Sequence, residues 1–299
     1  MSAVQIVEVG PRDGFQNIGP FIPTQTKIAM IRDLAAAGLK RMEVTSFVSA
    51  RAIPQLCDAP EVLADTLAQA KTLAQVLVPN ARYGLKALEA GATFLSYVFS
   101  ISESHNRSNV RASPEESLAD YARLVDGLPA GTRMRLNLAT SFDCPFEGRT
   151  PAARVLEFLE RAFEIMPEAE ICLCDTTGRG EPDQVGELFA QSMARCPEVA
   201  AWAMHAHDTY GRGADNVLAA HASGVRIFDA AIGGLGGCPY APGASGNVAT
   251  EDVVRLFHDM GVQTGVDAEA LLPIARRAAA LPGANAGSRC LLPAAGAPR

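Results

Sequence analysis

The chain has 299 residues, and its formal net charge at pH 7 is −7, because 33 acidic side chains outnumber 26 basic ones. Hydrophobic residues make up 48% of it and charged residues 20%, which is enough apolar material for a large core and excludes a disordered chain. The negative charge argues against a nucleic-acid-binding protein, which needs a basic face. The long uncharged stretch 230–250 is rich in glycine and carries two prolines, so we expect a loop there and no membrane span.

The first residues and the cysteines bear on the cellular compartment. The chain begins Met1-Ser2-Ala3 and runs at once into a strand-like segment, without the basic and apolar parts of a targeting leader. Its seven cysteines are irregularly spaced and include no C-x-x-C pair, so we expect reduced thiols in a cytoplasmic protein. Cys172 and Cys174 stand two apart in a predicted strand, where packing is the plain explanation and a metal or redox role the alternative.

Short apolar runs alternate with helical stretches along the chain. Strands are predicted at 6–9, 41–45, 74–79, 94–99, 133–139, 171–174, 200–206 and 226–231. Helices are predicted at 24–37, 59–71, 81–90, from 114 onward, and at 151–166, 181–195, 213–223, 250–260 and 268–280. The helix that begins at Pro114 has the clearest start signal, a capping box formed by Ser113 and Glu116.

Eight strand–helix repeats predict a (β/α)₈ TIM barrel, here a single domain over residues 1–299 with a short C-terminal helical extension. Residues from about 281 to 299 are rich in Ala, Gly and Pro, and we expect them to be loosely held. A doubly wound open sheet is the alternative. However, the turn after the first strand reads Gly10-Pro11-Arg12-Asp13-Gly14 rather than G-x-G-x-x-G, and the chain has no Walker A motif.

Polar residues gather at the ends of the predicted strands, where barrel enzymes carry out their chemistry. They are Arg12 and Asp13 after the first strand, Glu43 in the second, Asp175 at the end of the sixth, His205 and His207 at the end of the seventh, and Cys238 and Asn247 after the eighth.

His205 and His207 lie two apart on a strand, so both imidazoles face the barrel mouth. With the Asp13 carboxylate and the Asn247 amide they form a mixed nitrogen–oxygen ligand set without a thiolate. Such a set favours Mg²⁺ or Mn²⁺ and also suits Zn²⁺ or Co²⁺. Two hydrogen-bonded structural histidines are the alternative, and two His with a carboxylate also describe a non-haem iron oxygenase.

Arg12 and Cys238 are the candidates for catalysis. A guanidinium next to a metal can stabilise an oxyanion, although a salt bridge of Arg12 with Glu43 or Asp175 is the plainer interpretation. Cys238 follows a run of glycines, and a thiol in such a loop can donate or withdraw its proton as the loop closes. Of the remaining histidines, His105 is a candidate for ligand contact, and His221 and His258 are expected in helices as structural or surface residues.

Four segments resemble the 3-hydroxy-3-methylglutaryl-CoA (HMG-CoA) lyase family. They are GPRDG at 10–14, TSFVS at 45–49, HAHDTYG at 205–211 and GGLGGCPYAPGASGNVATE at 233–251, and the resemblance runs from about residue 6 to residue 266. It implies a metal-dependent lyase that cleaves a carbon–carbon bond in a 3-hydroxyacyl-CoA. HMG-CoA, which would yield acetyl-CoA and acetoacetate, is the leading substrate, and leucine degradation is one pathway that this activity would serve.

The resemblance also implies roles for individual residues. It implies that Asp13, His205, His207 and Asn247 bind the metal and that Gln16, Glu43 and Asp175 line or order the site. It also implies that His205 removes the hydroxyl proton, that Arg12 stabilises the enolate and that Cys238 protonates the enolate carbon. The implied partner is an acyl-CoA substrate. Neither nucleic acid nor membrane is expected as a partner, and barrels of this type often pair, which suggests a homodimer.

The sequence departs from the family pattern around the expected acyl pocket. Ile18 and Gly19 replace an acid and a base, ARAIP stands at 50–54, Asn137 stands where an aromatic is expected, and Cys172 and Cys174 replace small residues. None of these positions belongs to the metal set, so we expect the reaction class to hold more firmly than the substrate. The alternatives are a longer branched or methylmalyl-type thioester, an acetyl-CoA-dependent condensing synthase, and a catalytically silent binding barrel.

Overall fold

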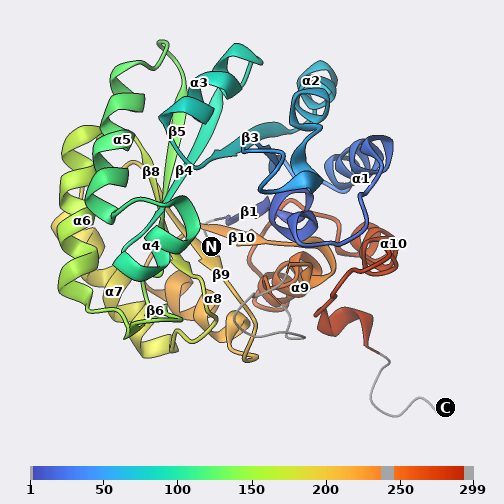
Figure 1. The fold of residues 1–299 in the computed structure, drawn as a ribbon. Coiled ribbons are helices and arrows are strands. Elements are labelled where there is room, and N and C mark those ends of the chain that lie inside the picture. Colours follow the sequence, from blue (N-terminus) through green and yellow to red (C-terminus); the bar gives the residue numbers. More distant parts are fainter. Residues whose placement is uncertain (1–2, 237–245, 293–299) are drawn as a thin grey trace.

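The structure is a computed structural model that describes residues 3–236 and 246–292, and it confirms the predicted (β/α)₈ barrel (Figure 1). Eight parallel strands close in the order β1-β10-β9-β8-β5-β4-β3-β2, and Glu8 of β1 pairs with Met42 of β2 to complete the ring. The barrel strands are β1 (Gln5–Glu8), β2 (Arg41–Ser46), β3 (Leu73–Val78), β4 (Phe94–Ser100), β5 (Arg133–Ala139), β8 (Glu170–Asp175), β9 (Trp202–Ala206) and β10 (Ile227–Ala230). A separate hairpin of β6 (Asp143–Cys144) and β7 (Gly148–Arg149) follows β5.

Helices surround the barrel (Figure 1). They are α1 (Thr24–Ala36), α2 (Ala59–Gln69), α3 (Ala81–Glu89), α4 (Glu103–Val110), α5 (Pro114–Asp126), α6 (Ala152–Ile165), α7 (Pro182–Arg195), α8 (Gly213–Ala222), α9 (Thr250–Asp259) and α10 (Ala268–Ala279). Short turns stand at η1 (Gly10–Gly14), η2 (Pro54–Leu56), η3 (Ile232–Gly234) and η4 (Arg289–Leu291). Within the described residues, no helix has the length and apolar character that crossing a membrane requires.

Local signals in the sequence explain several helix ends. The Ser113 hydroxyl accepts the backbone N–H of Glu116 at 3.0 Å, and the Glu116 carboxylate accepts that of Ser113 at 2.7 Å, so the predicted capping box is confirmed. Gly38 follows α1 with a φ of 104°, a backbone angle that residues other than glycine rarely adopt. The apolar runs and the turn chemistry therefore agree on where these helices begin and end.

Apolar side chains pack between the barrel and its helices, whereas much of the barrel interior is polar. In β5, Leu136 and Leu138 belong to the outer core, while Arg135 points inward and forms an ion pair with Asp229 of β10. This alternation is the period of two that strand geometry dictates. The inward-facing polar positions lead toward the carboxyl ends of the strands, where the predicted site residues lie.

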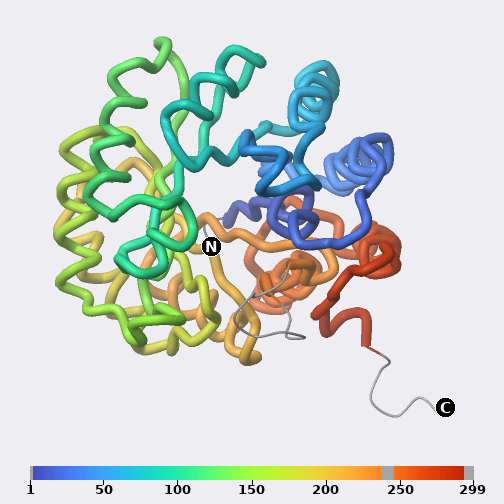
Figure 2. Tube along the Cα trace, viewed as in Figure 1, coloured from blue at the N-terminus to red at the C-terminus, as the bar shows by residue number. Residues whose placement is uncertain are grey.

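The C-terminal helices close the ring of helices. In the chain trace, α10 lies beside α1 although the two are far apart in sequence (Figure 2). The backbone N–H of Asp267 donates to the carbonyl of Ala37 at 2.8 Å, just before α10 begins. Beyond α10, the Asp252 carboxylate accepts the backbone N–H groups of Arg289 and Cys290 at 2.7 and 2.9 Å, so this part of the expected loose tail is hydrogen-bonded to α9.

Candidate active site

The turn η1 after β1 positions Arg12 and Asp13. It is a π-type turn in which the backbone N–H of Asp13 donates to the carbonyl of Val9 at 2.7 Å. Such turns are rare and often stand at functional sites. A Cβ on Gly14 would lie 2.9 Å from the Cβ of Leu235, so only glycine lets η1 pack this closely on the loop after β10. The turn thereby projects two charged residues in succession into the barrel mouth.

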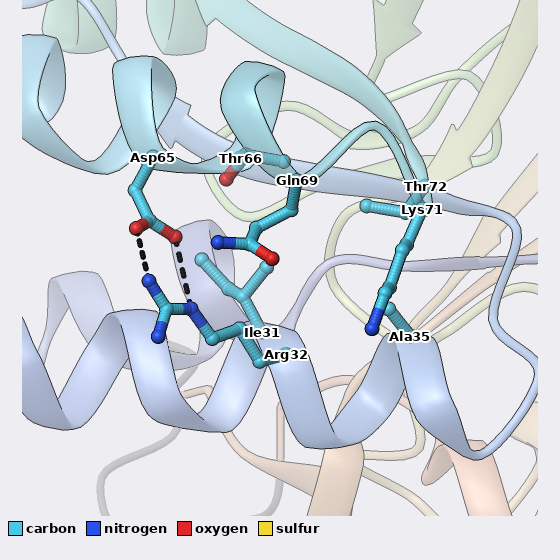
Figure 3. A pocket seen from close by; sticks show the side chains of 8 residues that line it. All are labelled: Ile31, Arg32, Ala35, Asp65, Thr66, Gln69, Lys71 and Thr72. Atoms are coloured by element: carbon cyan, nitrogen blue, oxygen red, sulfur yellow. Dashed lines mark hydrogen bonds and ion pairs between the residues drawn. The ribbon is translucent and has the colours of Figure 1, made fainter.

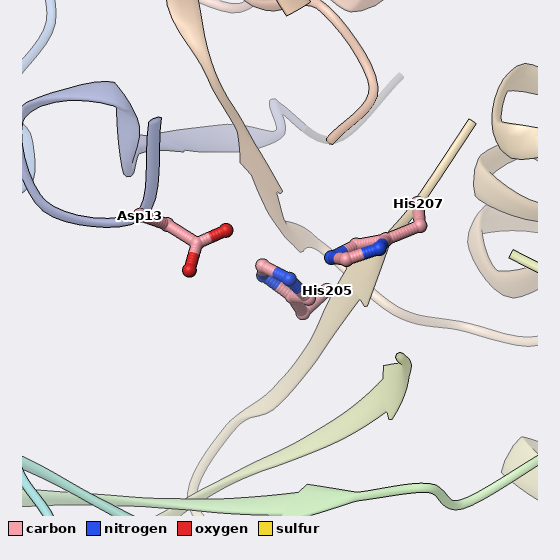
Figure 4. Close-up of side chains that lie close together, drawn as sticks. All are labelled: Asp13, His205 and His207. Atoms are coloured by element: carbon pink, nitrogen blue, oxygen red, sulfur yellow. The ribbon is translucent and has the colours of Figure 1, made fainter. Parts of the chain in front are cut away.

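Asp13, His205 and His207 meet at this mouth, as the sequence predicted. One potential ligand atom from each lies within 4.8 Å of the others. Asp13 approaches from the turn after β1, and the two imidazoles come from β9 and its end, with ring centroids 5.2 Å apart (Figure 4). Their side chains converge on one volume, which is the arrangement that a shared cation requires.

Asn247 completes the cluster. Its Nδ2 donates to Oδ2 of Asp13 at 2.6 Å and to the carbonyl of Leu235 at 3.0 Å, which fixes the orientation of the amide. Its Oδ1 is buried without a hydrogen-bond partner, and so is Nδ1 of His207. Buried polar atoms in proteins almost always have a partner. An unsatisfied amide oxygen and an unsatisfied imidazole nitrogen beside a carboxylate therefore fit a divalent cation.

The surroundings of Asp13 and His207 keep these two residues in the protonation states that bind metal. Burial raises the pKa of Asp13, but the charge of Arg12, both histidines and the Asn247 hydrogen bond outweigh it and hold that pKa at about 2. Burial and the neighbouring His205 lower the pKa of His207 to about 4. Asp13 is therefore an anion and His207 a neutral imidazole near neutral pH, as metal ligands must be.

Arg12 is held in place by two carboxylates. Its Nε donates to Oε1 of Glu43 at 2.5 Å, and its Nη1 pairs with Asp13. The second oxygen of Glu43 accepts Nε2 of Gln75 at 2.6 Å. The pairing of β2 with β3 shifts register between Glu43 and Thr45, an irregularity of the kind that re-aims side chains near active sites. The salt bridge of Arg12 with Glu43, which the sequence left as an alternative, is thus confirmed.

Asp229 lies behind His205, and sequence reasoning missed it. Its Oδ2 lies 3.1 Å from Nδ1 of His205, and its two oxygens accept Nη1 and Nη2 of Arg135 at 2.9 and 3.0 Å. Burial lowers the pKa of His205, but the Asp229 hydrogen bond and charge outweigh it and raise that pKa. An acidic residue inside the predicted strand 226–231, between Phe228 and Ala230, was the signal that could have pointed to it.

A cavity of about 450 Å³ opens from the cluster. Arg12, Asp13, Gln16, His205 and His207 lie at its polar end, and Gln16 Nε2 donates to Oδ1 of Asp13 at 2.7 Å. The walls also include apolar and uncharged polar side chains, among them Val48, Ile53, Leu77, Val98, His105, Asn137, Ala139 and Cys174. The predicted ligand contact of His105 is therefore sterically open, and the space is large enough for a small acyl group.

The predicted site residue Asp175 orders a loop next to the barrel mouth. The Asp175 carboxylate accepts the backbone N–H of Gly180 at 3.1 Å and Nδ2 of Asn216 at 3.3 Å, so it orders the loop after β8 and is not among the residues that line the cavity. Cys238 lies outside the described residues. The predicted helical positions of His221 and His258, in α8 and α9, are confirmed.

A second, smaller cavity lies between α1 and α2 (Figure 3). An ion pair between Arg32 and Asp65 spans it, and Arg32 is exposed to solvent. The residues lining it include neither histidine nor cysteine, so it offers no comparable chemistry.

The sequence resembles known proteins over most of its length. The sequence model of the HMGL-like family matches residues 3–277. The chain belongs to this family. A hydroxymethylglutaryl-CoA lyase of Pseudomonas mevalonii is 40% identical over 291 residues, which are 97% of this chain and 96% of that protein. An (R)-citramalyl-CoA lyase of Chloroflexus aurantiacus is 38% identical over 287 residues, 91% of this chain and 89% of that one.

Solved structures of HMG-CoA lyases have the same fold as this HMGL-like chain. An HMG-CoA lyase from Acinetobacter baumannii, in complex with coenzyme A and 3-methylmalate, matches it with a TM-score of 0.89 and 39% identity over 96% of this chain and 93% of that one. The resemblance drawn from four sequence segments is confirmed, and this member of the HMGL-like family is a carbon–carbon lyase.

Proposed function

We propose that this lyase cleaves a 3-hydroxyacyl-CoA in a metal-dependent reaction, with HMG-CoA giving acetyl-CoA and acetoacetate as the leading substrate and products. The observation that carries the proposal is the meeting of Asp13, His205 and His207 beside the unsatisfied Oδ1 of Asn247, at the end of a cavity that Arg12 also lines. We infer an acyl-CoA substrate because the relatives named above include HMG-CoA lyases, one of them in complex with coenzyme A.

Asp13, His205, His207 and Asn247 are the residues that we propose to hold the cation. Oxygen ligands and imidazoles without thiolates favour Mg²⁺ or Mn²⁺, and Zn²⁺ or Co²⁺ also suit them. When bound, a divalent cation would supply Lewis acidity and lower the pKa of a substrate hydroxyl. Asp229 holds Nδ1 of His205, so this residue presents only Nε2 to the site. One nitrogen cannot be ligand and base at once, and we assign His205 the ligand role.

Arg12 is placed to stabilise the enolate of the leaving acyl-CoA. Its guanidinium is permanently charged, lines the cavity and is oriented by Glu43. Negative charge develops on the thioester oxygen only as the carbon–carbon bond breaks, so an interaction with that oxygen lowers the barrier without tightening the binding of the substrate. The Asp13 side chain keeps the guanidinium next to the proposed cation site.

Cys238 is the residue that we propose as the proton donor to the enolate carbon. In the sequence it follows Gly236 and precedes Gly246, two described residues whose backbones are hydrogen-bonded: the N–H of Gly246 donates to the carbonyl of Gly236 at 3.1 Å. Asn247, the next residue after Gly246, already contacts Asp13. A thiol donates its proton readily near neutral pH, and the enolate needs one proton at carbon to become acetyl-CoA.

A second substrate deserves a parallel test, because Asn137 lines the cavity where the family resemblance predicts an aromatic residue. Nδ2 of Asn137 donates to Ser96 Oγ at 2.8 Å and to the carbonyl of Tyr97 at 3.0 Å, so the amide is fixed in the wall. A changed wall alters which acyl substituent fits. The 38% identity to a citramalyl-CoA lyase makes that thioester the natural comparison.

The test is release of acetyl-CoA from HMG-CoA and from citramalyl-CoA by purified protein, in EDTA, in Mg²⁺ and in Mn²⁺. We expect release from HMG-CoA only with metal, and we expect Cys238→Ser to abolish it. Cys290→Ser is the matched control, since Cys290 lies beside Asp252 of α9 and away from the cavity. Faster release from citramalyl-CoA would replace the leading substrate. No release from either thioester by metal-loaded protein would reject the proposed function.

A further inference from the structure

Two cysteines of β8 form a close pair inside the barrel. Sγ of Cys172 lies 3.9 Å from Sγ of Cys174, and the side chains are 0% and 6% exposed. Residues two apart on a strand point to the same face, here the interior. Cys172 pairs in register with Asn137 of β5 and Cys174 with His205 of β9. The proposed reaction uses neither thiol.

The pair has a cationic neighbour and an open side. The guanidinium of Arg135 lies beside Cys172. Ala203 of β9 packs against the two cysteines on another side. Cys174 also lines the active-site cavity, together with His205 and Asp229. A small ion in the cavity can therefore reach a sulfur atom that is otherwise enclosed.

The sulfur separation suits chelation better than a disulfide. A tetrahedral cation with metal–sulfur bonds of about 2.3 Å holds two sulfurs about 3.8 Å apart, close to the separation found here. Cα atoms two apart on a straight strand are about 6.6 Å apart, near the upper end of what a disulfide tolerates, and a disulfide would draw the sulfurs to about 2.05 Å. Chelation needs almost no movement of the strand.

We propose that Cys172 and Cys174 form a second cation site, separate from the Asp13–His205–His207 cluster, that takes a soft divalent d¹⁰ ion such as Cd²⁺ or Zn²⁺. Each thiol releases its proton to solvent as its sulfur–metal bond forms, so two thiolates neutralise the ion. Water from the cavity fills the remaining positions. Hard oxygen-seeking ions such as Mg²⁺ are excluded, because thiolates select soft metals.

Occupancy of this site would obstruct the cavity. Cys174 contributes to the cavity wall close to His205, so an ion with its bound water at this position takes space from the substrate. We therefore expect inhibition that excess Mg²⁺ does not relieve and that a small dithiol does relieve. The binding measurement itself requires no substrate, so it stands or falls separately from the proposed lyase activity.

The experiment is titration of the Mg²⁺-saturated protein with Cd²⁺, followed by the ultraviolet thiolate-to-cadmium charge-transfer band and by cadmium X-ray absorption. Wild-type protein should bind one tight equivalent with two sulfur ligands. Cys172→Ser and Cys174→Ser should each weaken Cd²⁺ binding by about a hundredfold or more, since each removes one of two thiolates. Circular dichroism and thermal unfolding establish that the variants are folded.

Cys57→Ser combined with Cys290→Ser is the matched control, because neither residue lines the active-site cavity. It should bind Cd²⁺ as the wild type does, and so should Cys238→Ser. Tight Cd²⁺ binding with an unchanged charge-transfer band in folded Cys172→Ser and Cys174→Ser would overturn the proposal. So would a wild-type spectrum with oxygen and nitrogen ligands only, or a band that disappears in either control.

Discussion

Nδ1 of His205 lies 3.1 Å from Oδ2 of Asp229, and this contact connects the proposed metal site to a chain of buried charges through the barrel. Asp229 is paired with Arg135, Arg135 lies 3.3 Å from Glu170, and Glu170 is paired with Arg41 at 2.7 Å. Gln75 continues from Arg41 to Glu43, which holds Arg12. This network of buried charges therefore runs from His205, a proposed metal ligand, to Arg12, the proposed enolate-stabilising residue.

Asp229→Asn should weaken metal binding about 10- to 100-fold, the usual effect of losing a partner that orients a ligating histidine. The amide has one accepting oxygen in place of two, so it cannot keep all three contacts with His205 and Arg135. Mn²⁺ affinity, measured by electron paramagnetic resonance, checks this. Asp58→Asn is the control, because it breaks the buried ion pair with Lys27, which lies away from the site. It should reduce stability and leave Mn²⁺ affinity unchanged; equal losses of affinity in both variants would contradict the account.

Glu43→Gln should lower kcat by about tenfold or more and change KM little. The variant removes the charge that holds Arg12, and a misplaced guanidinium loses an interaction made mainly in the transition state. Steady-state kinetics with the preferred thioester measures the two constants. An unchanged kcat with a raised KM would mean that Glu43 serves substrate binding instead.

Glu8→Gln should remove a pH dependence of stability. Glu8 is fully buried, and burial raises its pKa from 4.5 to about 7 despite hydrogen bonds from Thr250, Ile232 and Gly10. A carboxyl group whose pKa is higher in the folded than in the unfolded protein stabilises the fold at pH values below its unfolded pKa. That stabilisation is lost as the pH rises through its folded pKa. The wild-type free energy of unfolding should thus fall by about 3 kcal/mol between about pH 4.5 and about pH 7 from this group.

Urea unfolding at several pH values across that interval measures the effect. The Gln oxygen can accept the backbone N–H groups of Gly10 and Ile232, and its amide nitrogen can donate to the Thr250 hydroxyl. Because this amide does not titrate, the variant should show a flatter profile than the wild type. Profiles of equal slope would show that Glu8 does not titrate in this interval.

Metal binding should stabilise the fold. Ligand at about one hundred times its Kd contributes about 2.7 kcal/mol to the free energy of unfolding. Differential scanning calorimetry in EDTA and in Mn²⁺ should therefore give a higher Tm with metal. His207→Ala removes an imidazole whose Nδ1 has no other partner, and it should abolish most of that increase. A metal-induced rise of equal size in the variant would place the ion elsewhere.

The sequence predicted the barrel and the meeting of Asp13, His205 and His207 for a clear physical reason. Strand periodicity and turn signals are local, and the carboxyl ends of parallel strands must share one end of a barrel. Asp13 and His205 are distant in sequence, yet both follow from that rule. The short helix α4 was missed because it is polar except for Val110, its last residue. Its start is capped by Ser102, and Oδ1 of Asn106 accepts the backbone N–H of Ser100 at 2.8 Å.

The charge network inside the barrel could not be predicted in the same way. Arg135 and Asp229 are 94 residues apart, and nothing in their own segments says that each compensates the other. Pairing across the interior depends on strand tilt and register, which are properties of the closed barrel. The same limit applies to Gln75, which joins Arg41 to Glu43 although an isolated Gln in a strand carries no signal of function.

The most direct test of the central claim is Mn²⁺ titration of EDTA-stripped protein with simultaneous measurement of bound Mn²⁺ and of acetyl-CoA release from HMG-CoA. The account predicts that the rate rises in proportion to bound metal and saturates at one ion per chain. It also predicts that Asp13→Asn and His207→Ala shift both curves together to higher Mn²⁺. Full activity in the stripped protein, or a rate that does not follow the metal bound by Asp13 and His207, would contradict it.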